Sequence, residues 1–438
     1  MKMISQLREA VKLPDLRSRM FFMLWGFFVF ELGRHVPLPQ INPEALARLF
    51  GDNDSLFGML NMFSGGALKQ FSIFALGVMP YINASIMLQL LTVALPSLKK
   101  LAQEGETGRQ QIAMYTRWLT VVLAIFQSLG LTTVLKQAGG GVNGTLGIGA
   151  QLGTVVSMTA GTMFLLWLGE QITEKGIGNG VSLVIFIGIM VNLPQQIAQT
   201  LHLWFIGSLS FVSVAGVAVF FVLTVVGIIF IQQGERQIRV QYARRVVGTR
   251  MMGGASTYLP MKVNQAGVMP IIFAISVALF PKTIFTFIPY QADWWVSIKN
   301  FVSNYLTPNT GSGLSMFVSL GFYFVLVVGF TFFYTSVTYD PTEVADNLKK
   351  WGGQIKGIRA GAETARFIDR VLTRITFAGA LFLGVLALLQ YVEPVITKVH
   401  TFGLVGGTSL LIVIGVALET MQQIEAHLLM RHYKGFIG

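Results

Sequence analysis

Long apolar stretches alternate with polar loops along the whole of this 438-residue chain. A helix needs about 20 mostly apolar residues to cross the ~30 Å hydrocarbon layer of a bilayer. The pattern predicts ten such spans and therefore an all-α polytopic membrane protein. They lie at about 20–37, 70–95, 117–135, 153–171, 179–194, 212–232, 265–281, 314–337, 370–390 and 408–428.

Composition also indicates lipid as the main solvent. Apolar residues make up 53% of the chain and charged residues 12%, whereas soluble proteins carry about a quarter charged residues. The mean hydropathy is +0.63. Cysteine is absent, which excludes disulfides and thiolate chemistry. Residues 1–20 are typical of an amphipathic cytoplasmic segment and not of a cleaved signal peptide, since their basic region is too long.

Lysine and arginine are concentrated in alternate loops. If the N-terminus lies in the cytoplasm, 25 of the 32 basic residues fall on the inner side and 7 on the outer side. The positive-inside rule selects this orientation and predicts that the C-terminus is cytoplasmic too. The basic residues left outside are Arg34, Arg48, Lys69, Lys136, Lys282, Lys299 and Lys398.

The stretch from Leu56 to Leu95 carries one charge, Lys69, and is too long for one span. Two full spans would invert every later loop, so we expect one span at 70–95, preceded by a short segment that dips in from the outer face. Irregular backbone at membrane depth needs cover from protein or water, which predicts a cavity; an interfacial helix on the outer leaflet is the alternative. The segment comprises Leu56, Phe57, Gly58, Met59, Leu60, Asn61, Met62, Phe63, Ser64, Gly65 and Gly66.

Ten spans divide into five and five around an outer loop near 195–211. This predicts an N-terminal half at 1–196 and a C-terminal half at 197–438. Because each half crosses the membrane an odd number of times, the second half enters from the opposite side. Any similarity between the halves would be an inverted repeat, with the working site at their interface.

Catalytic and metal-binding patterns are missing from the sequence. Glu31, Glu170 and Glu419 lie near predicted span ends, whereas transporters usually place ionisable groups deep in the membrane. The Gly-Ile-Gly-Asn-Gly run at 176–180 lacks the ending of a phosphate-binding loop and predicts a tight turn. The five histidines lack metal-ligand spacing. We therefore expect no enzyme activity, cofactor or metal.

Two long inner loops, 233–263 and 338–374, are rich in arginine and lysine. Their charge could serve only to hold them inside, near anionic lipid. Their length needs another reason, because the commonest connections have about 2–6 residues and long loops are often functional. Arginines suit phosphate or acidic surfaces, so a large cytoplasmic partner is the sharper hypothesis.

Four groups of residues form recognisable signatures. They run from Phe74 to Ile86 with Gln89 to Thr92, from Trp167 to Gly180, from Leu259 to Asn264, and from Ala345 to Lys350 with Gly357 to Arg359. These segments resemble the signatures of the SecY family of protein-conducting channels. They occur in the family's order over nearly the whole chain, and the longer ones are highly specific.

The resemblance implies a clam-shell of two five-helix halves around an hourglass pore, in the bacterial plasma (inner) membrane. It implies that unfolded secretory polypeptides cross the middle and that membrane segments leave sideways into lipid. The implied partners are the small subunits SecE and SecG, the SecA motor, the ribosome with its RNA, nascent chains, signal sequences and membrane lipids. The chain has no energy-coupling motif, so a motor or ribosome is expected to drive transport.

The resemblance also assigns residues to the channel. Residues 56–66 correspond to the family's plug, which seals the resting pore from the outer side. The pore ring, an apolar constriction, falls on Val78, Ile82, Ile185, Ile189, Ile272 and Ile412. Independently, the first four of these form i,i+4 pairs, each on one helix face; such pairs in membrane helices commonly face lipid or another helix.

A lateral gate and docking sites are implied in the same way. Thr92 and Gln127 match polar gate residues, and a hydrogen bond between helices is their alternative role. Ala360 and Lys356 stand where the family usually has proline, which leaves the loop-tip conformation open. The residues that match ribosome-contacting positions are Arg244, Arg245 and Arg250, and Arg359 matches one important for SecA.

Two other classes of function remain as alternatives. Ten spans with possible inverted halves also fit a secondary transporter of a small solute, although buried ionisable groups are missing. A membrane scaffold whose loops recruit partners is the third hypothesis.

Overall fold

The computed structural model describes residues 13–39, 41, 64–137, 147–242, 245–247, 250–252, 256–287, 293–308, 313–399 and 407–434, with only the backbone at 137, 245–247, 250–252, 283, 286–287 and 429–434. Each of the ten predicted spans overlaps one long helix of this described part. These helices are α2 (Pro14–Arg34), α5 (Met79–Ala94), α7 (Glu106–Gln137), α8 (Ile148–Lys175), α9 (Gly180–Phe205), α10 (Phe211–Gln233), α11 (Met269–Phe287), α13 (Leu314–Thr338), α15 (Ala362–Thr397) and α16 (Gly407–Lys434).

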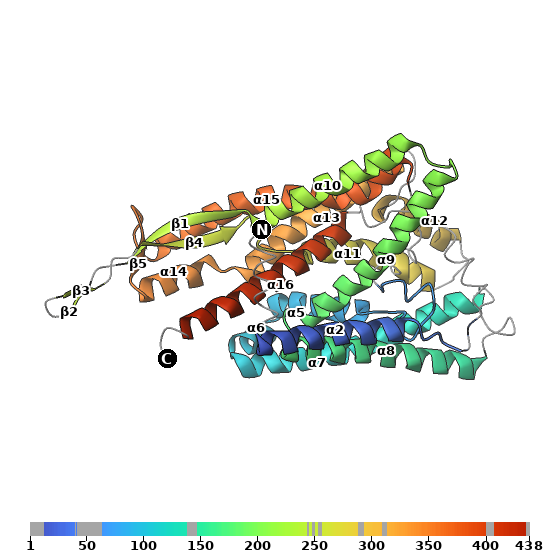
Figure 1. Cartoon of the computed structure of the whole chain (residues 1–438), viewed down its shortest axis with the longest axis horizontal. Coiled ribbons are helices and arrows are strands. Elements are labelled where there is room, and N and C mark those ends of the chain that lie inside the picture. Colours follow the sequence, from blue (N-terminus) through green and yellow to red (C-terminus); the bar gives the residue numbers. More distant parts are fainter. Residues whose placement is uncertain are drawn as a thin grey trace.

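The helices form two groups that lie one above the other (Figure 1). One group contains α2, α5, α7 and α8, and the other contains α10, α13, α15 and α16, while α9 crosses from the first group to the second. Helix α11 lies between them and contacts both α7 and α13. This arrangement matches the expected clam-shell, and it confirms a helical membrane protein.

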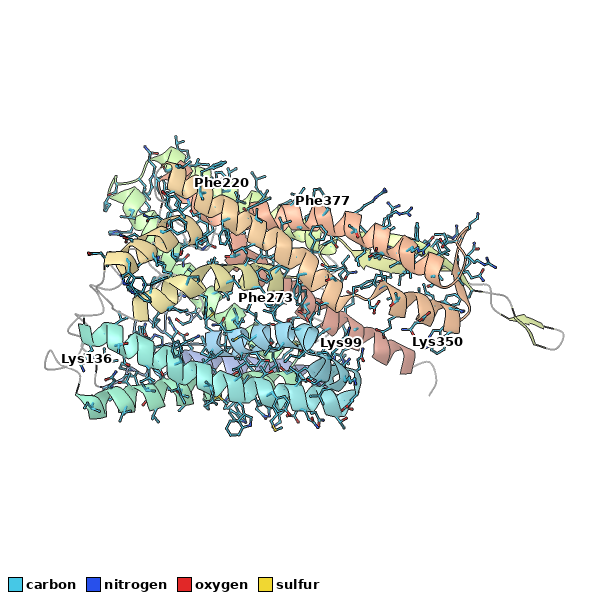
Figure 2. All side chains as sticks on the ribbon, turned by 180° about the vertical axis from the view of Figure 1, so that it is seen from behind. Lys99, Lys136, Phe220, Phe273, Lys350 and Phe377 are labelled. Carbon is cyan, nitrogen blue, oxygen red and sulfur yellow. The ribbon has the colours of Figure 1, made fainter. Side chains whose placement is uncertain are left out.

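The helices present apolar side chains outward, as lipid-facing helices do. Seven helices of the described residues are long and apolar enough to cross a membrane, and α5 with the short helix α6 (Pro96–Gln103) forms an eighth unit bent by 102°. The side chains of Phe230 and Phe317 are 77% and 79% exposed, which in water would be costly. Figure 2 shows Phe377 on the outside of the bundle and Phe273 in its interior.

The second predicted span is shorter than expected. A helix over 70–95 was predicted, but α5 begins only at Met79, and residues 64–78 form a chain of tight turns. Positive φ angles at Phe71 and Gly77 break any helix there. Pro80 then lies in the first turn of α5, where proline is well tolerated.

Two other boundaries also differ from the prediction. The outer loop predicted at 195–211 is mostly helix, because α9 continues through Pro194 to Phe205. The ninth span was predicted to begin at 370, but α15 begins at Ala362. Its first turns carry charged residues, which hydropathy alone assigns to a loop. The predicted turn at 176–180 is confirmed, with Gly178 at φ +93° and Asn179 capping α9.

The two basic loops fold together into one module at one end of the bundle. Strand β1 (Glu235–Tyr242) pairs antiparallel with β4 (Ser256–Lys262) and with β5 (Gly353–Ile355). The strands β2 (Arg245–Val247) and β3 (Arg250–Met252) form a small hairpin, and α14 (Pro341–Lys350) precedes β5. Ile238 and Val240 of β1 face Ile368 of α15 in a separate apolar cluster. The sequence prediction did not place this sheet.

The ends of the bundle differ in charge as the loop pattern predicts. Lys99 and Lys350, both predicted to lie inside, are at one end, and Lys136, predicted to lie outside, is at the other (Figure 2). The short helix α12 (Asp293–Phe301) and the π-helical turn η1 (Val302–Leu306) connect α11 to α13. They lie at the end away from the β strands (Figure 1).

Candidate functional site

The residues predicted for the pore ring come together at the centre of the molecule. All six belong to one apolar cluster, although they come from opposite halves of the chain. Their exposed fractions range from 1% at Ile189 to 8% at Ile185. None of the six therefore lies on the lipid-facing surface, and of the two alternatives for the i,i+4 pairs, packing against another helix stays open. The six are Val78, Ile82, Ile185, Ile189, Ile272 and Ile412.

Local structure explains why these side chains point inward. Val78 is the residue just before α5, and Ile82 follows one turn later, with its amide donating to the Val78 carbonyl at 3.1 Å. Ile185 and Ile189 are separated by one turn of α9 in the same way. Each pair thus occupies one face of one helix. The two faces meet in the central cluster.

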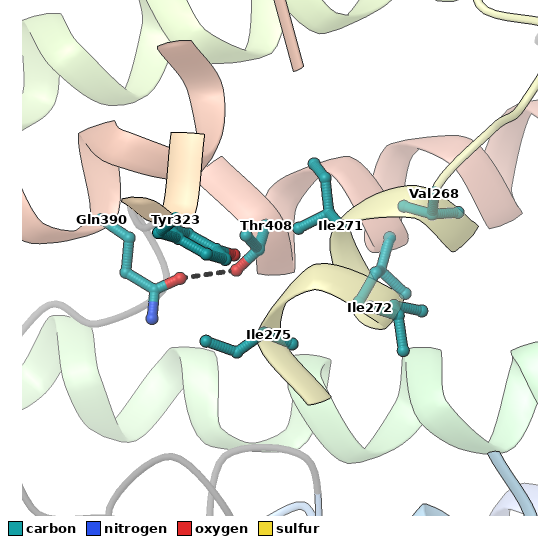
Figure 3. A pocket seen from close by; sticks show the side chains of 8 residues that line it. Val268, Ile271, Ile272, Ile275, Tyr323, Gln390 and Thr408 are labelled. Atoms are coloured by element: carbon teal, nitrogen blue, oxygen red, sulfur yellow. Dashed lines mark hydrogen bonds between the residues drawn. The ribbon is translucent and has the colours of Figure 1, made fainter. Parts of the chain in front are cut away.

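The ring residues of the C-terminal half line a pocket. Ile272 of α11 and Ile412 of α16 border it together with Tyr323 of α13, and Figure 3 shows the side chains around it. One polar contact closes its side: the Thr408 hydroxyl donates to Oε1 of Gln390 at 2.6 Å. The remaining wall is aliphatic, with Val268, Ile271 and Ile275. The pocket offers an apolar surface and few directed hydrogen bonds.

Only the end of the predicted plug falls within the described residues. Residues 56–63 lie outside them, whereas Ser64, Gly65 and Gly66 are described and Ser64 is 2% exposed. Gly65 has a φ of +69°, and a methyl group added to it would lie 2.7 Å from Cα of Gly188. Gly188 precedes the ring residue Ile189. The end of the segment therefore packs directly beside the ring.

The turns that follow the plug continue this contact with the helices. Phe74 is 2% exposed, and its ring stacks between Phe30 of α2 and Phe164 of α8, with centroids 6.1 and 5.9 Å away. A methyl group at Gly161 of α8 would lie 1.9 Å from the carbonyl oxygen of Ile73. Gly161 thus admits irregular backbone close to α8, and protein covers this backbone, as irregular backbone at membrane depth requires.

The two predicted gate residues lie on neighbouring helices. Thr92 is in α5 and Gln127 is in α7, and these helices pack against each other. Both side chains are partly exposed. The Thr92 hydroxyl donates to the Leu88 carbonyl of its own helix at 2.5 Å, so this bond does not join two helices. Helix α7 also contacts α11, so the N-terminal and C-terminal halves touch along this side.

The predicted docking arginines lie in the module of the two basic loops. Arg359 is exposed in the turn between β5 and α15, between Gly357 and Gly361, both at positive φ. The backbone carbonyl of Arg359 accepts a hydrogen bond from the Thr364 hydroxyl at 2.9 Å, which anchors the turn to α15. Arg245 and Arg250 lie in β2 and β3, where only the backbone is described, and Arg244 is outside the described residues.

The sequence reasoning missed a second basic surface on this module. Arg366, Arg370 and Arg374 follow one another at four-residue spacing along α15 and are all exposed. Together with Asp369 and Thr373 they line a shallow hollow. The four-residue spacing could have revealed this stripe, but the region was assigned to a loop.

Two of the three carboxylates predicted near span ends, Glu31 and Glu170, form ion pairs. Glu31 and Arg34 of α2 form an ion pair at 2.6 Å, and Glu170 of α8 pairs with Arg117 of α7 at 2.8 Å. Neither pair lies among the six ring side chains. Within the described ranges, no three His, Asp or Glu side chains gather closely enough to hold a metal ion.

Comparison with known proteins agrees with the geometry. The SecY family profile matches residues 72–421. The chain is 44% identical to "Protein translocase subunit SecY" of Escherichia coli K12, with 96% of this chain and 94% of that protein covered. It is 44% identical to the protein of the same name in Thermotoga maritima, with 98% and 97% covered.

Solved channel structures share the fold. One, described as "The structure of a protein conducting channel", has a TM-score of 0.67 at 16% identity and covers 94% of this chain and 92% of its own. Another, Sec61 in a canine ribosome-channel complex, has a TM-score of 0.64 at 16% identity, with the same coverage. Because the family profile and relatives over 40% identical span nearly the whole chain, this protein belongs to the SecY family.

Proposed function

We propose that this chain is a protein-conducting channel of the bacterial inner membrane, which passes unfolded secretory polypeptides. The observation that carries the proposal is the meeting of six aliphatic side chains from both halves in one buried cluster. Family membership supports it, since the relatives are protein translocase subunits. The division into halves at 1–196 and 197–438 belongs to the same proposal, with the pore between them.

An aliphatic ring suits both tasks of such a channel. It offers ions no replacement for their water of hydration and can close by dewetting. It also offers a moving peptide no specific hydrogen bonds that would hold it back. In this structure all six ring side chains are buried, which corresponds to a sealed channel.

Residues 56–66 act as the plug in this proposal. A structure with a TM-score of 0.64 to this chain is described as showing that the plug domain of its SecY protein stabilises the closed state and maintains a membrane seal. Here the contact of Gly65 with Gly188 brings the end of the segment next to Ile185 and Ile189. Displacing the segment would uncover the ring from the outer side.

The side where α7 meets α11 is proposed as the lateral gate. Thr92 and Gln127 supply partly exposed polar groups on this side. Signal sequences would enter here, and membrane segments would leave here into lipid. Opening would require α7 and α11, which come from the two halves and touch here, to separate.

The basic module is proposed as the docking surface for driving partners. Similar structures include channels bound to canine and yeast ribosomes. Exposed arginines suit ribosomal RNA and acidic protein surfaces. We propose SecE and SecG as membrane partners, SecA and the ribosome as sources of driving force, and cytoplasmic termini. The chain itself acts as a channel subunit and not as an enzyme.

Crosslinking to a stalled secretory chain tests the channel directly. A photoreactive residue at Ile82 or Ile272 should form an adduct with the chain, and the same probe at the lipid-facing Phe317, 79% exposed, should not. A solute transporter would give no adduct at any of these positions. Adducts confined to Phe317 would overturn the proposed path.

A further inference from the structure

Arg34 is a buried positive charge at the outer end of α2. It is only 8% exposed, and it lies on the side of the membrane where the loop pattern leaves few basic residues. Burying a charged group is costly unless it is paired and hydrogen-bonded. Its partners therefore indicate what the residue does.

The guanidinium of Arg34 uses its three nitrogens on two partners. Nε donates to Oε2 of Glu31 at 3.0 Å, and one terminal nitrogen donates to Oε1 of Glu31 at 2.6 Å. The other terminal nitrogen donates to the backbone carbonyl of Gly65 at 3.0 Å. The bidentate pair with Glu31 fixes the plane of the guanidinium. Its remaining nitrogen is thereby aimed at the end of the plug.

The backbone at the end of the plug is packed too closely for a side chain. A methyl group at Gly66 would lie 3.1 Å from the Arg34 guanidinium and 3.0 Å from Oδ1 of Asn192 in α9. The approach at Gly65 is closer still, since a methyl group there would lie 2.7 Å from Cα of Gly188. The end of the plug thus lies between a charged clamp on α2 and the ring-bearing face of α9.

We propose that Glu31, Arg34 and the Gly65 carbonyl form an outer clamp that holds the plug in its resting position, and that releasing this clamp is a step in opening the channel. The inference rests on the proposed channel function and adds a positioning residue to it. A hydrogen bond from a charged group to a carbonyl is strong, yet it is a single contact that can break without unfolding either helix. If Arg34 served only to stabilise α2, removing its side chain would leave the seal of the channel unchanged.

The absence of cysteine permits a direct test. Ser64→Cys introduces one thiol at a site that is 2% exposed, where a membrane-impermeant thiol reagent added outside should react slowly. In this background, Arg34→Met removes the clamp. Loss of a hydrogen bond to a charged group corresponds to a change of roughly tenfold to a hundredfold in an equilibrium constant. We expect the labelling rate and the resting ion leak of proteoliposomes to rise within that range.

Two further variants separate clamping from folding. Arg117→Met breaks a second arginine–glutamate pair, the more exposed one between α7 and α8, and should raise neither leak nor labelling. Arg34→Lys keeps the charge but lacks the planar fork, so it should give intermediate rates, and it serves as the test variant if Arg34→Met fails to fold.

Unchanged leak and labelling in the folded Arg34 variants would overturn the clamp. A rise of equal size in Arg117→Met would overturn it too, because general loosening would then explain the effect. Neither result would contradict the proposed channel function, which the crosslinks from Ile82 and Ile272 test independently.

Discussion

Ile189 and Ile197 are two isoleucines of α9 with the same chemistry and opposite surroundings. Ile189 is 1% exposed in the central cluster, whereas Ile197 is 39% exposed farther along the helix. The sequence alone does not distinguish them, because both are apolar residues in an apolar stretch. Their difference in packing decides which one can seal a pore.

Ile189→Ser should make the resting channel leaky to ions. A hydroxyl in an apolar constriction favours water entry, so we expect a leak roughly tenfold above that of the unmodified protein. The measurement is ion efflux from proteoliposomes that contain the purified protein. Ile197→Ser is the matched control and should leave the leak unchanged. Equal leaks from both variants would remove Ile189 from the pore ring.

At the scale of helices and turns, the space between neighbouring backbones decides which residues can be accommodated. Helix α8 carries Gly161 where the turns after the plug pass, and Gly149 near its beginning, where no atom lies within 4 Å of an added methyl group. The position of Gly161 has no room for a side chain, whereas the position of Gly149 does. Irregular backbone can enter the membrane region only where a helix surface is this small.

Gly161→Ala should destabilise the protein by about 1–3 kcal/mol, the usual cost of overpacking. The added methyl would meet a backbone carbonyl, which cannot rotate away. Thermal unfolding of the purified protein measures the loss. Gly149→Ala should be neutral or stabilise by up to about 1 kcal/mol, since alanine favours helix. A Gly161→Ala protein as stable as the Gly149→Ala protein would contradict this packing.

Asp340 caps the first turn of α14 and makes that helix sensitive to acid. Its carboxylate accepts hydrogen bonds from the hydroxyl and the amide of Thr342, which lower the pKa of Asp340 below its ordinary value of 3.8. A group with a lowered pKa stabilises the folded state above its ordinary pKa. That contribution is lost as the pH falls through the lowered value.

Hydrogen exchange of the α14 amides checks this cap. Protection should fall as the pH drops below 3.8, and Asp340→Ala should cost about 1 kcal/mol of local stability at neutral pH. Asp340→Asn keeps an acceptor oxygen and should retain protection without the acid sensitivity. An acid response that persists in Asp340→Asn would have to come from another group.

At the scale of the whole molecule, function depends on residues that are distant in sequence. The two basic loops meet in one sheet, in which Val240 of the first loop pairs with Ile355 of the second. That sheet packs on α15 through Ile368, so the proposed docking surface and a membrane helix form one unit. In the proposed function, a partner that binds the module would therefore act on the C-terminal half.

Arg359→Glu tests the link between this module and transport. Charge reversal at an exposed docking residue should lower motor-driven export by roughly tenfold, since like charges at an interface are costly. The amount of folded protein should change little, because the Arg359 backbone, and not its side chain, anchors the turn. Export into membrane vesicles measures the effect. Lys398→Glu, at the other end of α15, is the matched control. Equal loss of export and of folded protein would remove the docking role.

Much of this architecture could be predicted without a structure. Hydropathy placed all ten long helices, because a bilayer imposes length and apolarity on each helix separately. Local backbone chemistry placed the turn at 176–180, where glycine at positive φ and a capping asparagine act within a few residues. These features depend on neighbours in sequence.

Tertiary structure decided which segments contact one another, which the hydropathy pattern does not reveal. The late start of α5 and the contact of Gly65 with Gly188 depend on the packing of turns against helices. The clamp at Arg34 requires a carbonyl 31 residues away in sequence. The apolar pattern of a membrane helix looks alike whether it faces lipid or protein, because both are apolar surroundings. The sequence therefore determined which segments enter the membrane, and only the folded chain decided which of their side chains meet.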